Sequence, residues 1–134
     1  MDDIFVARLM SPDVVTVTPD TLVEEAAERL REHIIGSLVV VDEDNHLRGI
    51  LTSTDFVHIV AESNPKVETT VERYMTSEVI TAEAQDPIRD AADKMITYKI
   101  HHLPVVDDSE GVIGMLSTAD LTAYISEVEK PSPA

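Results

Sequence analysis

An internal repeat runs through almost the whole chain. Residues 6–60 align with residues 71–125 without a gap, and the identical pairs fall mainly at apolar and turn positions. These pairs include Met10/Met75, Ala26/Ala91, Leu38/Leu103, Gly49/Gly114 and Asp55/Asp120. Two copies of one supersecondary unit are therefore expected. A copy of about 60 residues buries little apolar surface, so the copies should pack against each other rather than fold alone.

Each copy has the pattern strand, helix, strand, strand, helix. In the first copy, residues 14–17 and 38–42 are apolar or β-branched runs, and residues 21–34 place apolar side chains on one helical face. The spacing of Thr21 and Glu24 predicts a helix cap, and Asp86 followed by Pro87 predicts the equivalent start in the second copy. The sequence therefore predicts a mixed α/β fold with two βαββα repeats. Their bounds are 4–62 and 71–128, with a linker over 63–70 and a disordered tail over 129–134.

Cysteine is absent, which excludes disulfides, thiolate catalysis and thiolate metal ligation. The N-terminus MDDIFVARLM is acidic where a signal peptide would be basic, and no apolar run approaches the roughly 18 residues of a membrane span. A soluble, cytoplasmic protein is expected.

The net charge of −16, from 26 acidic and 10 basic residues, is extreme for 134 residues. Nucleic acid is not expected as a partner, because phosphate backbones are bound by basic surfaces. Concentrated salt would screen the self-repulsion of such a chain, which is typical of a halophilic protein. An ordinary acidic domain would have the same composition, so both interpretations remain open.

Each copy places a hydroxyl and a carboxylate three residues apart where an apolar strand meets a helix. The stretches are GILTSTDF at 49–56 and GMLSTADL at 114–121. The N–H groups at a helix start attract phosphate, and the hydroxyls of Thr52 and Ser117 can donate to a phosphate oxygen. The carboxylates of Asp55 and Asp120 can accept from a ribose diol. The same residue types serve as ordinary helix caps, so one copy alone would leave nucleotide binding and capping both open.

The order and duplication of these motifs resemble a tandem pair of cystathionine β-synthase (CBS) domains, also called a Bateman module. The resemblance rests on LMSPDVVTVTPDTLVEEAAERL, GSLVVVDEDNHLRGILTSTDF, YMTSEVITAEAQDPIRDAADKM and HHLPVVDDSEGVIGMLSTADL, and it covers residues 4 to about 128. It implies a standalone pair of repeats related by a pseudo-twofold axis. It also implies clefts for AMP, ADP, ATP or S-adenosylmethionine, a regulated partner protein and a homodimer. No further cofactor is implied.

The resemblance also implies which residues would surround an adenine. These are Met10 and Val15 in the first copy, with Met75 and Ile80 in the second, flanked by Ile50 and Met115. All six could equally be core residues.

In the family, each cleft borrows the residues just before the LPVVD-type strand of the opposite copy. The cleft of Asp55 would then receive His101 and His102, whose imidazoles can donate to phosphate, whereas the cleft of Asp120 would receive Gly36 and Ser37. The sequence therefore predicts that the Asp55 cleft prefers a phosphorylated ligand. It also predicts that the Asp120 cleft is weaker or accepts a less charged adenosine compound.

Other functions receive less support. Successive side chains of a strand point to opposite faces, so His101 and His102 are not expected to share a metal ion, and no metal site is predicted. His33, His46 and His58 are expected to be solvated. No nucleophile stands beside a base, so no enzyme is predicted. The alternative function is a structural, dimerising module with empty clefts that pairs through the last helix of each copy, by residues such as Phe56, Ile59, Tyr124 and Val128.

Overall fold

The computed structural model describes residues 4–62 and 68–126, which form two compact units. The division falls between residues 14 and 15 and between residues 79 and 80. The repeat-one unit holds residues 15–62 and 68–79, and the repeat-two unit holds residues 4–14 and 80–126. The first segment of each copy, residues 4–14 or 71–79, therefore belongs to the unit formed mainly by the other copy. The tail predicted over 129–134 lies outside the described residues, as do residues 63–67 of the predicted linker.

The repeat-one unit contains a sheet of order β1-β2-β3, with β1 parallel to β2 and β2 antiparallel to β3. The strands are β1 (Thr16–Val17), β2 (Ser37–Val41) and β3 (Leu47–Thr52). Helix α2 joins β1 to β2, helix α3 follows β3 without a loop, and the short helix α4 comes from the second copy. Their bounds are α2 (Val23–His33), α3 (Ser53–Ala61) and α4 (Val71–Tyr74).

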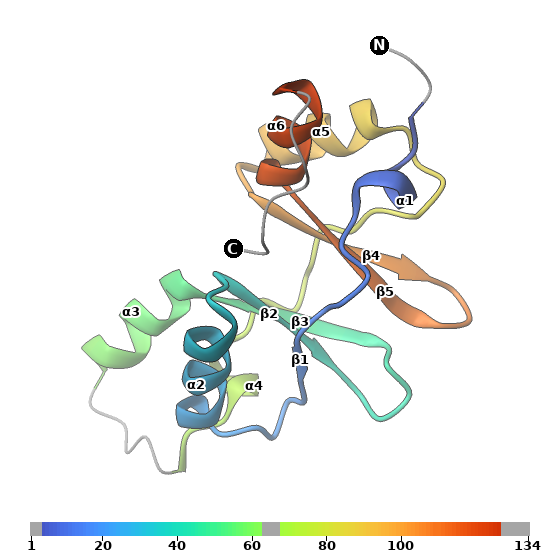
Figure 1. The fold of residues 1–134 in the computed structure, drawn as a ribbon. Helices are drawn as coiled ribbons and strands as arrows, with labels where there is room; N and C mark the ends of the chain where they lie inside the picture. Colours follow the sequence, from blue (N-terminus) through green and yellow to red (C-terminus); the bar gives the residue numbers. More distant parts are fainter. Residues whose placement is uncertain (1–3, 63–67, 127–134) are drawn as a thin grey trace. The chain divides into compact units, whose positions relative to one another are not determined.

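The repeat-two unit contains counterparts of the helices and of the hairpin strands, but no counterpart of β1. It comprises α1 (Val6–Leu9), α5 (Ile88–Tyr98), β4 (His102–Asp107), β5 (Gly111–Ser117) and α6 (Thr118–Ser126). Figure 1 shows α1, in blue, beside the yellow-to-red elements of this unit, and α4, in yellow-green, near the start of α2. The mixed α/β fold with two strand-and-helix repeats is thus confirmed.

The first strand of the second copy is reduced to a single bridge between Ala82 and Val105. In the first copy, the Val39 N–H donates to the Val15 carbonyl at 3.3 Å and lengthens the parallel ladder. Pro104 occupies the equivalent position in β4 and has no N–H, so that hydrogen bond cannot form. One residue difference therefore shortens one strand.

Backbone hydrogen bonds hold the exchanged segments in place. The Val6 N–H donates to the Asp86 carbonyl at 2.9 Å, and at the equivalent place the Val71 N–H donates to the Thr21 carbonyl at 2.8 Å. Val6 and Val71 are each 0% exposed and pack into the cores of the units they join. Each unit is therefore incomplete without its exchanged segment.

The same segments cap the long helices. The N–H of Val23 at the start of α2 donates to the Thr69 carbonyl, and the N–H of Ile88 at the start of α5 donates to the Ile4 carbonyl, at 3.0 and 2.9 Å. These helices start later than the sequence predicted, with Leu22 and Pro87 as cap residues and no side-chain cap bond.

Thr21 and Asp86 instead stabilise the turns before the helices. The Thr21 hydroxyl accepts from the Thr18 N–H at 3.1 Å, and the Asp86 carboxylate accepts from the Glu83 N–H at 2.9 Å. The predicted capping roles of both residues were therefore wrong. Ile34, the last apolar residue of the helix expected over 21–34, is not buried: it ends the helix in the left-handed region and is 80% exposed.

Candidate functional site

In the repeat-one unit, β3 passes directly into α3 at Thr52. The backbone N–H of Thr52 donates to Asp55 Oδ2 at 2.8 Å, and the Thr52 hydroxyl lies 3.3 Å from the same oxygen. The N–H of Asp55 in turn faces the Thr52 side chain, which completes a capping box. The carboxylate is thus fixed at the helix start through Oδ2.

The repeat-two unit has the same junction between β5 and α6. The Ser117 N–H donates to Asp120 Oδ2 at 2.9 Å, and the Asp120 N–H donates to the Ser117 hydroxyl at 3.2 Å. Asp120 is 6% exposed, whereas Asp55 is only half-buried. The helix caps that the sequence allowed are therefore present in both copies, and the second carboxylate is the less accessible one.

The residues at the start of β2 and β4 lie beside these junctions within their own units. Ser37 pairs with Thr52 across the first hairpin, and His102 pairs with Ser117 across the second. The carbonyls of Gly36 and His101 accept the N–H groups of the first residues of α3 and α6, each at 3.0 Å. The opposite pairing, between Asp55 and the two histidines, remains a prediction.

The methionines named from the sequence lie against the strands that lead to the junctions. Met10 packs against Gly114, and Met75 packs against Gly49. Ser11 and Met115 exchange backbone hydrogen bonds of 2.8 and 2.9 Å, and the equivalent pair Ile50 and Thr76 does the same, with both bonds 2.9 Å long.

The exchange of segments divides the candidate ligand residues between the two units. Met10 and Val15, which the sequence grouped together, belong to different units, as do Met75 and Ile80. The repeat-one unit holds Val15, Gly36, Ser37, Ile50, Thr52, Asp55 and Met75. The repeat-two unit holds Met10, Ile80, His101, His102, Met115, Ser117 and Asp120. Each unit therefore contains a methionine that the other copy encodes.

The CBS domain family model matches residues 6–62 and, separately, residues 71–127. The chain belongs to the CBS domain family. Among solved structures, the CBS domain pair of protein MJ0100, in complex with 5′-methylthioadenosine and S-adenosyl-L-methionine, is 33% identical with a TM-score of 0.85. The match covers 94% of this chain and 98% of that one, so the likeness extends over both CBS repeats.

Curated relatives include both short and long proteins. An uncharacterised 17.7 kDa protein of Acidianus ambivalens is 34% identical over 92% of this chain and 74% of its own length. Homoserine O-acetyltransferase of Methanosalsum zhilinae is 36% identical over 93% of this chain. The CBS pair spans only 25% of that acetyltransferase, so the match concerns one part of the enzyme. Within residues 4–62 and 68–126, no helix combines the length and apolar character needed to cross a membrane.

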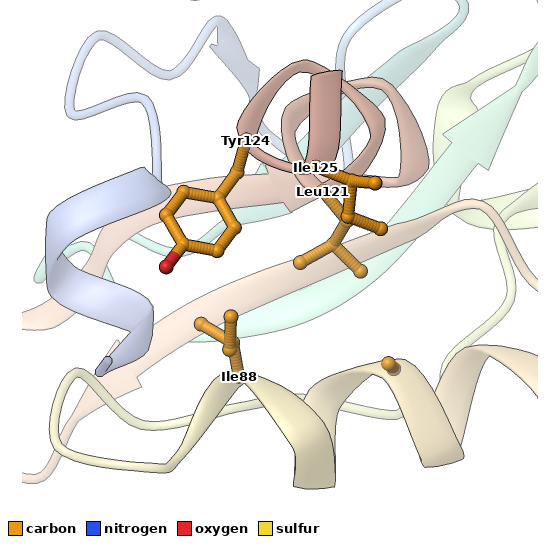
Figure 2. Close-up of a pocket in the computed structure, with 5 residues that line it drawn as sticks. Ile88, Leu121, Tyr124 and Ile125 are labelled. Carbon is orange, nitrogen blue, oxygen red and sulfur yellow. The ribbon is translucent and has the colours of Figure 1, made fainter. Parts of the chain in front are cut away.

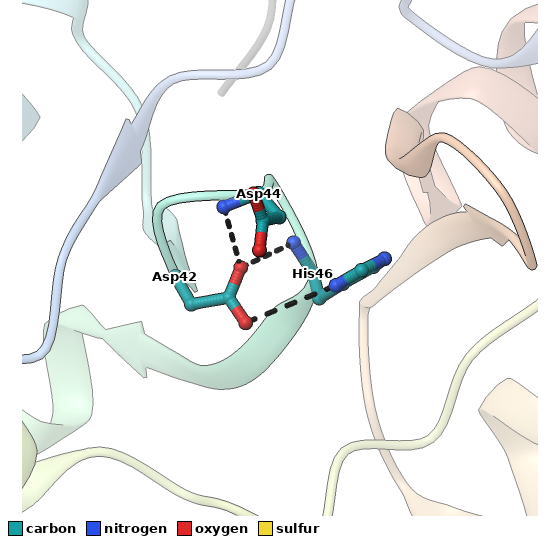
Figure 3. Close-up of polar contacts among 3 residues, drawn as sticks. All are labelled: Asp42, Asp44 and His46. Atoms are coloured by element: carbon teal, nitrogen blue, oxygen red, sulfur yellow. Dashed lines mark hydrogen bonds and ion pairs between the residues drawn. The ribbon is translucent and has the colours of Figure 1, made fainter.

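The turn between β2 and β3 of the first CBS repeat brings three polar side chains close together (Figure 3). Asp42 Oδ1 accepts the N–H groups of Asp44 and His46, both at 2.9 Å, and Asp42 Oδ2 lies 3.9 Å from His46 Nδ1. The hydrogen bond from the His46 backbone is the main reason that the pKa of Asp42 lies below its ordinary value of 3.8. The sequence did not predict this cluster, because residues 42, 44 and 46 come together only when the turn forms.

An apolar groove of about 80 Å³ lies between α5 and α6 of the second CBS repeat (Figure 2). Its lining consists of Ile88, Ala92, Leu121, Tyr124 and Ile125. An aliphatic and aromatic lining does not recognise ribose or phosphate, so this groove suits a protein surface better than a nucleotide.

Of the residues predicted to pair copies of the chain, Ile59 is 4% exposed and is buried within its own unit. Phe56 is partly buried against the repeat-one core, and Val128 lies outside the described residues. The exposed apolar side chains on the last helices are instead Val57, Val60 and Ile125, at 66%, 71% and 72%. Val60 and Ile125 occupy equivalent positions of the two repeats.

Proposed function

We propose that this chain is a regulatory, ligand-sensing CBS pair that binds adenosine-containing compounds and signals their presence to a partner protein. The supporting observation is the duplicated junction, where a strand passes into a helix through a hydroxyl residue and a fixed carboxylate. The role is regulation of another protein rather than catalysis. Its ligands are of the AMP, ADP, ATP or S-adenosylmethionine type.

The chemistry of the junction supports this proposal. Helices α3 and α6 begin at the junctions, where the positive end of the helix dipole favours phosphate. The contacts between Asp55 and Thr52 use Oδ2 alone. A carboxylate accepts hydrogen bonds through both oxygens, so Asp55 can accept from a ribose hydroxyl through Oδ1 while Oδ2 keeps the cap.

The relatives support the ligand class and the regulatory role. The CBS pair of protein MJ0100, similar along both repeats, was solved with two adenosine compounds. The matched part of the acetyltransferase is a quarter of that enzyme, which suggests that a CBS pair serves as a module beside a catalytic domain. If a ligand changes the affinity of this chain for one of two states of a target protein, ligand binding shifts the target between those states.

Binding is best tested on the full chain with AMP, ATP, NAD, S-adenosylmethionine and 5′-methylthioadenosine. A thermal-shift screen would identify the ligand, and calorimetry would measure its affinity in Asp55→Asn and Asp120→Asn. Asparagine keeps an acceptor for the cap but loses the charge, so we expect at least one substitution to weaken binding about tenfold, equal to about 1.4 kcal/mol. Asp13→Asn removes one charge from an exposed position and serves as the control. If none of the five compounds binds, the sensing proposal is wrong.

The two junctions are expected to differ in ligand preference. The second copy carries His101 and His102 where the first copy carries Gly36 and Ser37, so phosphate should be favoured at the junction on which the imidazoles act. Replacing both histidines with alanine should weaken the binding of AMP more than the binding of adenosine. Combining that change with Asp55→Asn, and separately with Asp120→Asn, measures which carboxylate is coupled to the histidines. Equal losses for AMP and adenosine would contradict the preference.

A second candidate function is a dimerising module that acts without a ligand. The observation in its favour is the exposed apolar pair formed by Val60 and Ile125, at equivalent positions of α3 and α6. Val60→Lys and Ile125→Lys should each weaken a homodimer in sedimentation equilibrium. Ile96→Lys is the control, because Ile96 is 76% exposed but its repeat equivalent is Arg31. A dimer that persists while none of the five compounds binds would favour this candidate over sensing.

A further inference from the structure

Three side chains with metal-ligating atoms converge on the turn between β2 and β3 (Figure 3). One such atom from each of Asp42, Asp44 and His46 lies within 4.8 Å of the other two. We infer that this turn is a binding site for a divalent transition metal ion, with Zn²⁺ as the occupant. The inference goes beyond nucleotide sensing, because it concerns the opposite end of β3 from the Thr52 junction.

One pair of ligand atoms already lies near the separation that a tetrahedral zinc site requires. With bonds of about 2.1 Å, two ligand atoms of a tetrahedral zinc ion lie about 3.4 Å apart. Asp42 Oδ2 and His46 Nδ1 are 3.9 Å apart, and these side chains are 32% and 51% exposed. A shift of about half an ångström, which exposed side chains make by small rotations, would bring this pair to the ligand separation.

The fold of the turn requires only one of the three side chains. In the equivalent turn between β4 and β5, Asp107 accepts the N–H groups of Ser109 and Glu110 at 3.0 and 2.9 Å, much as Asp42 does in the first turn. Ser109 and Gly111 stand where the first turn has Asp44 and His46. The second turn is therefore built without the added carboxylate and imidazole.

The added groups increase charge where the chain already has an excess of acid. Asp44 lies beside Asp42 in a chain with a net charge of −16. A bound cation would relieve the repulsion between the two carboxylates. The imidazole of His46 pairs with Asp42 at 3.9 Å, and metal ligation would use Asp44 as well as these two groups.

The donor set selects the class of metal. One imidazole nitrogen and two carboxylate oxygens suit Zn²⁺ and its neighbours, whereas Mg²⁺ and Ca²⁺ prefer oxygen ligands alone. Three protein ligands leave a fourth position for water or for a group of another molecule. The site is separated from Thr52 by the length of β3, about 17 Å at 3.3 Å per residue, so its failure and that of the ligand proposal are distinguishable.

Calorimetry with ZnCl₂ on the tag-free full chain tests the inference, with Co²⁺ absorption as a report of tetrahedral ligation. We expect one ion per chain, and at least about tenfold weaker binding in both Asp44→Ser and His46→Ala. Asp44→Ser installs the residue of the second turn, so it should preserve the fold, which circular dichroism and AMP binding would verify. Mg²⁺ should bind at least about 100-fold more weakly than Zn²⁺.

Three controls exclude other sources of binding. Asp108→Asn removes a charge from the second turn, His33→Ala removes a histidine elsewhere, and alanine at both His101 and His102 removes the adjacent pair. All three variants should bind Zn²⁺ like the wild type. Zinc binding that survives both Asp44→Ser and His46→Ala, or that is lost only with His101 and His102, overturns the inference. Absence of zinc binding by the wild-type chain overturns it too.

Discussion

The thioether of Met10 lies where a side chain on Gly114 would have to be. A Cβ atom on Gly114 would stand 2.6 Å from Met10 Sδ, and the equivalent atom on Gly49 would stand 2.7 Å from Met75 Sδ. No ordinary contact is that short, so each glycine makes room for a methionine from the other copy. These two contacts attach the exchanged segments to the strands that lead to the candidate site.

Gly114→Ala should therefore destabilise the protein by about 1–3 kcal/mol, as overpacking does. The double variant Gly114→Ala with Met10→Ala should recover part of the lost stability, because the Met10 side chain is the main obstacle to the new methyl group. At Gly49 the carbonyl of Thr76 would also be only 2.8 Å from the new atom, and Met75→Ala should recover less. Urea unfolding of the four variants measures both recoveries. Equal recovery at the two glycines would contradict this account.

The buried valines of the short helices should stabilise the unit that they join, not the copy that encodes them. Val6→Ala removes a fully buried side chain from the repeat-two core and should cost about 2 kcal/mol. Native-state hydrogen exchange should show reduced protection of β4 and β5, with β2 and β3 less affected. Val71→Ala is the matched variant and should show the reverse. Reduced protection of β2 and β3 alone in Val6→Ala would refute the exchange.

Sequence patterns predicted the elements but could not predict this exchange. Apolar periodicity depends on local burial, and it identified the long helices and the hairpin strands of both copies, but the first strand expected in the second copy is only a single bridge. Val6 and Val71 are identical, as are Met10 and Met75, so the sequence does not distinguish which copy each segment completes. Local capping signals failed at α2 and α5 for a related reason, since backbone carbonyls from the exchanged segments satisfy the first N–H groups.

The candidate site was partly predictable from the sequence. The capping spacing of Thr52 with Asp55 is local, so it could be read directly and the structure contains it. The cluster on the β2–β3 turn was missed, because Asp42, Asp44 and His46 converge only when Asp42 accepts two backbone N–H groups and Asn45 turns the chain at a φ of 67°. A histidine at that spacing carries no signal until the turn is known.

The carboxyl group of Asp107 should titrate below its ordinary range. The Ser109 hydroxyl, and then the N–H groups of Glu110 and Ser109, donate to this carboxylate and lower its pKa from 3.8. Because the pKa is depressed in the folded state, the stabilisation is complete above the ordinary pKa and is lost as the pH falls through the depressed one.

Carbon NMR of the side-chain carboxyl should therefore give an Asp107 midpoint below 3.8, and Ser109→Ala should move that midpoint upward. The same substitution should weaken the dependence of stability on pH below about pH 4. Asp108→Asn is the control, because the three hydrogen bonds to the Asp107 carboxylate come from Ser109 and Glu110 and not from the Asp108 side chain. A midpoint that is unchanged by Ser109→Ala would show that the hydroxyl does not set the pKa.

The acidic composition predicts that salt stabilises the fold. With 26 acidic and 10 basic residues, the folded chain repels itself, and the screening length falls from about 10 Å at 0.1 M to about 3 Å at 1 M salt. Raising KCl from 0.1 to 2 M should therefore raise the melting temperature by about 4 °C or more, which corresponds to about 1 kcal/mol. Sucrose at matched osmolality is the control, because it stabilises proteins by being excluded from their surface and does not screen charge. If the protein melts at the same temperature across the KCl series, the interpretation as an ordinary acidic domain holds and adaptation to a salty cytoplasm is rejected.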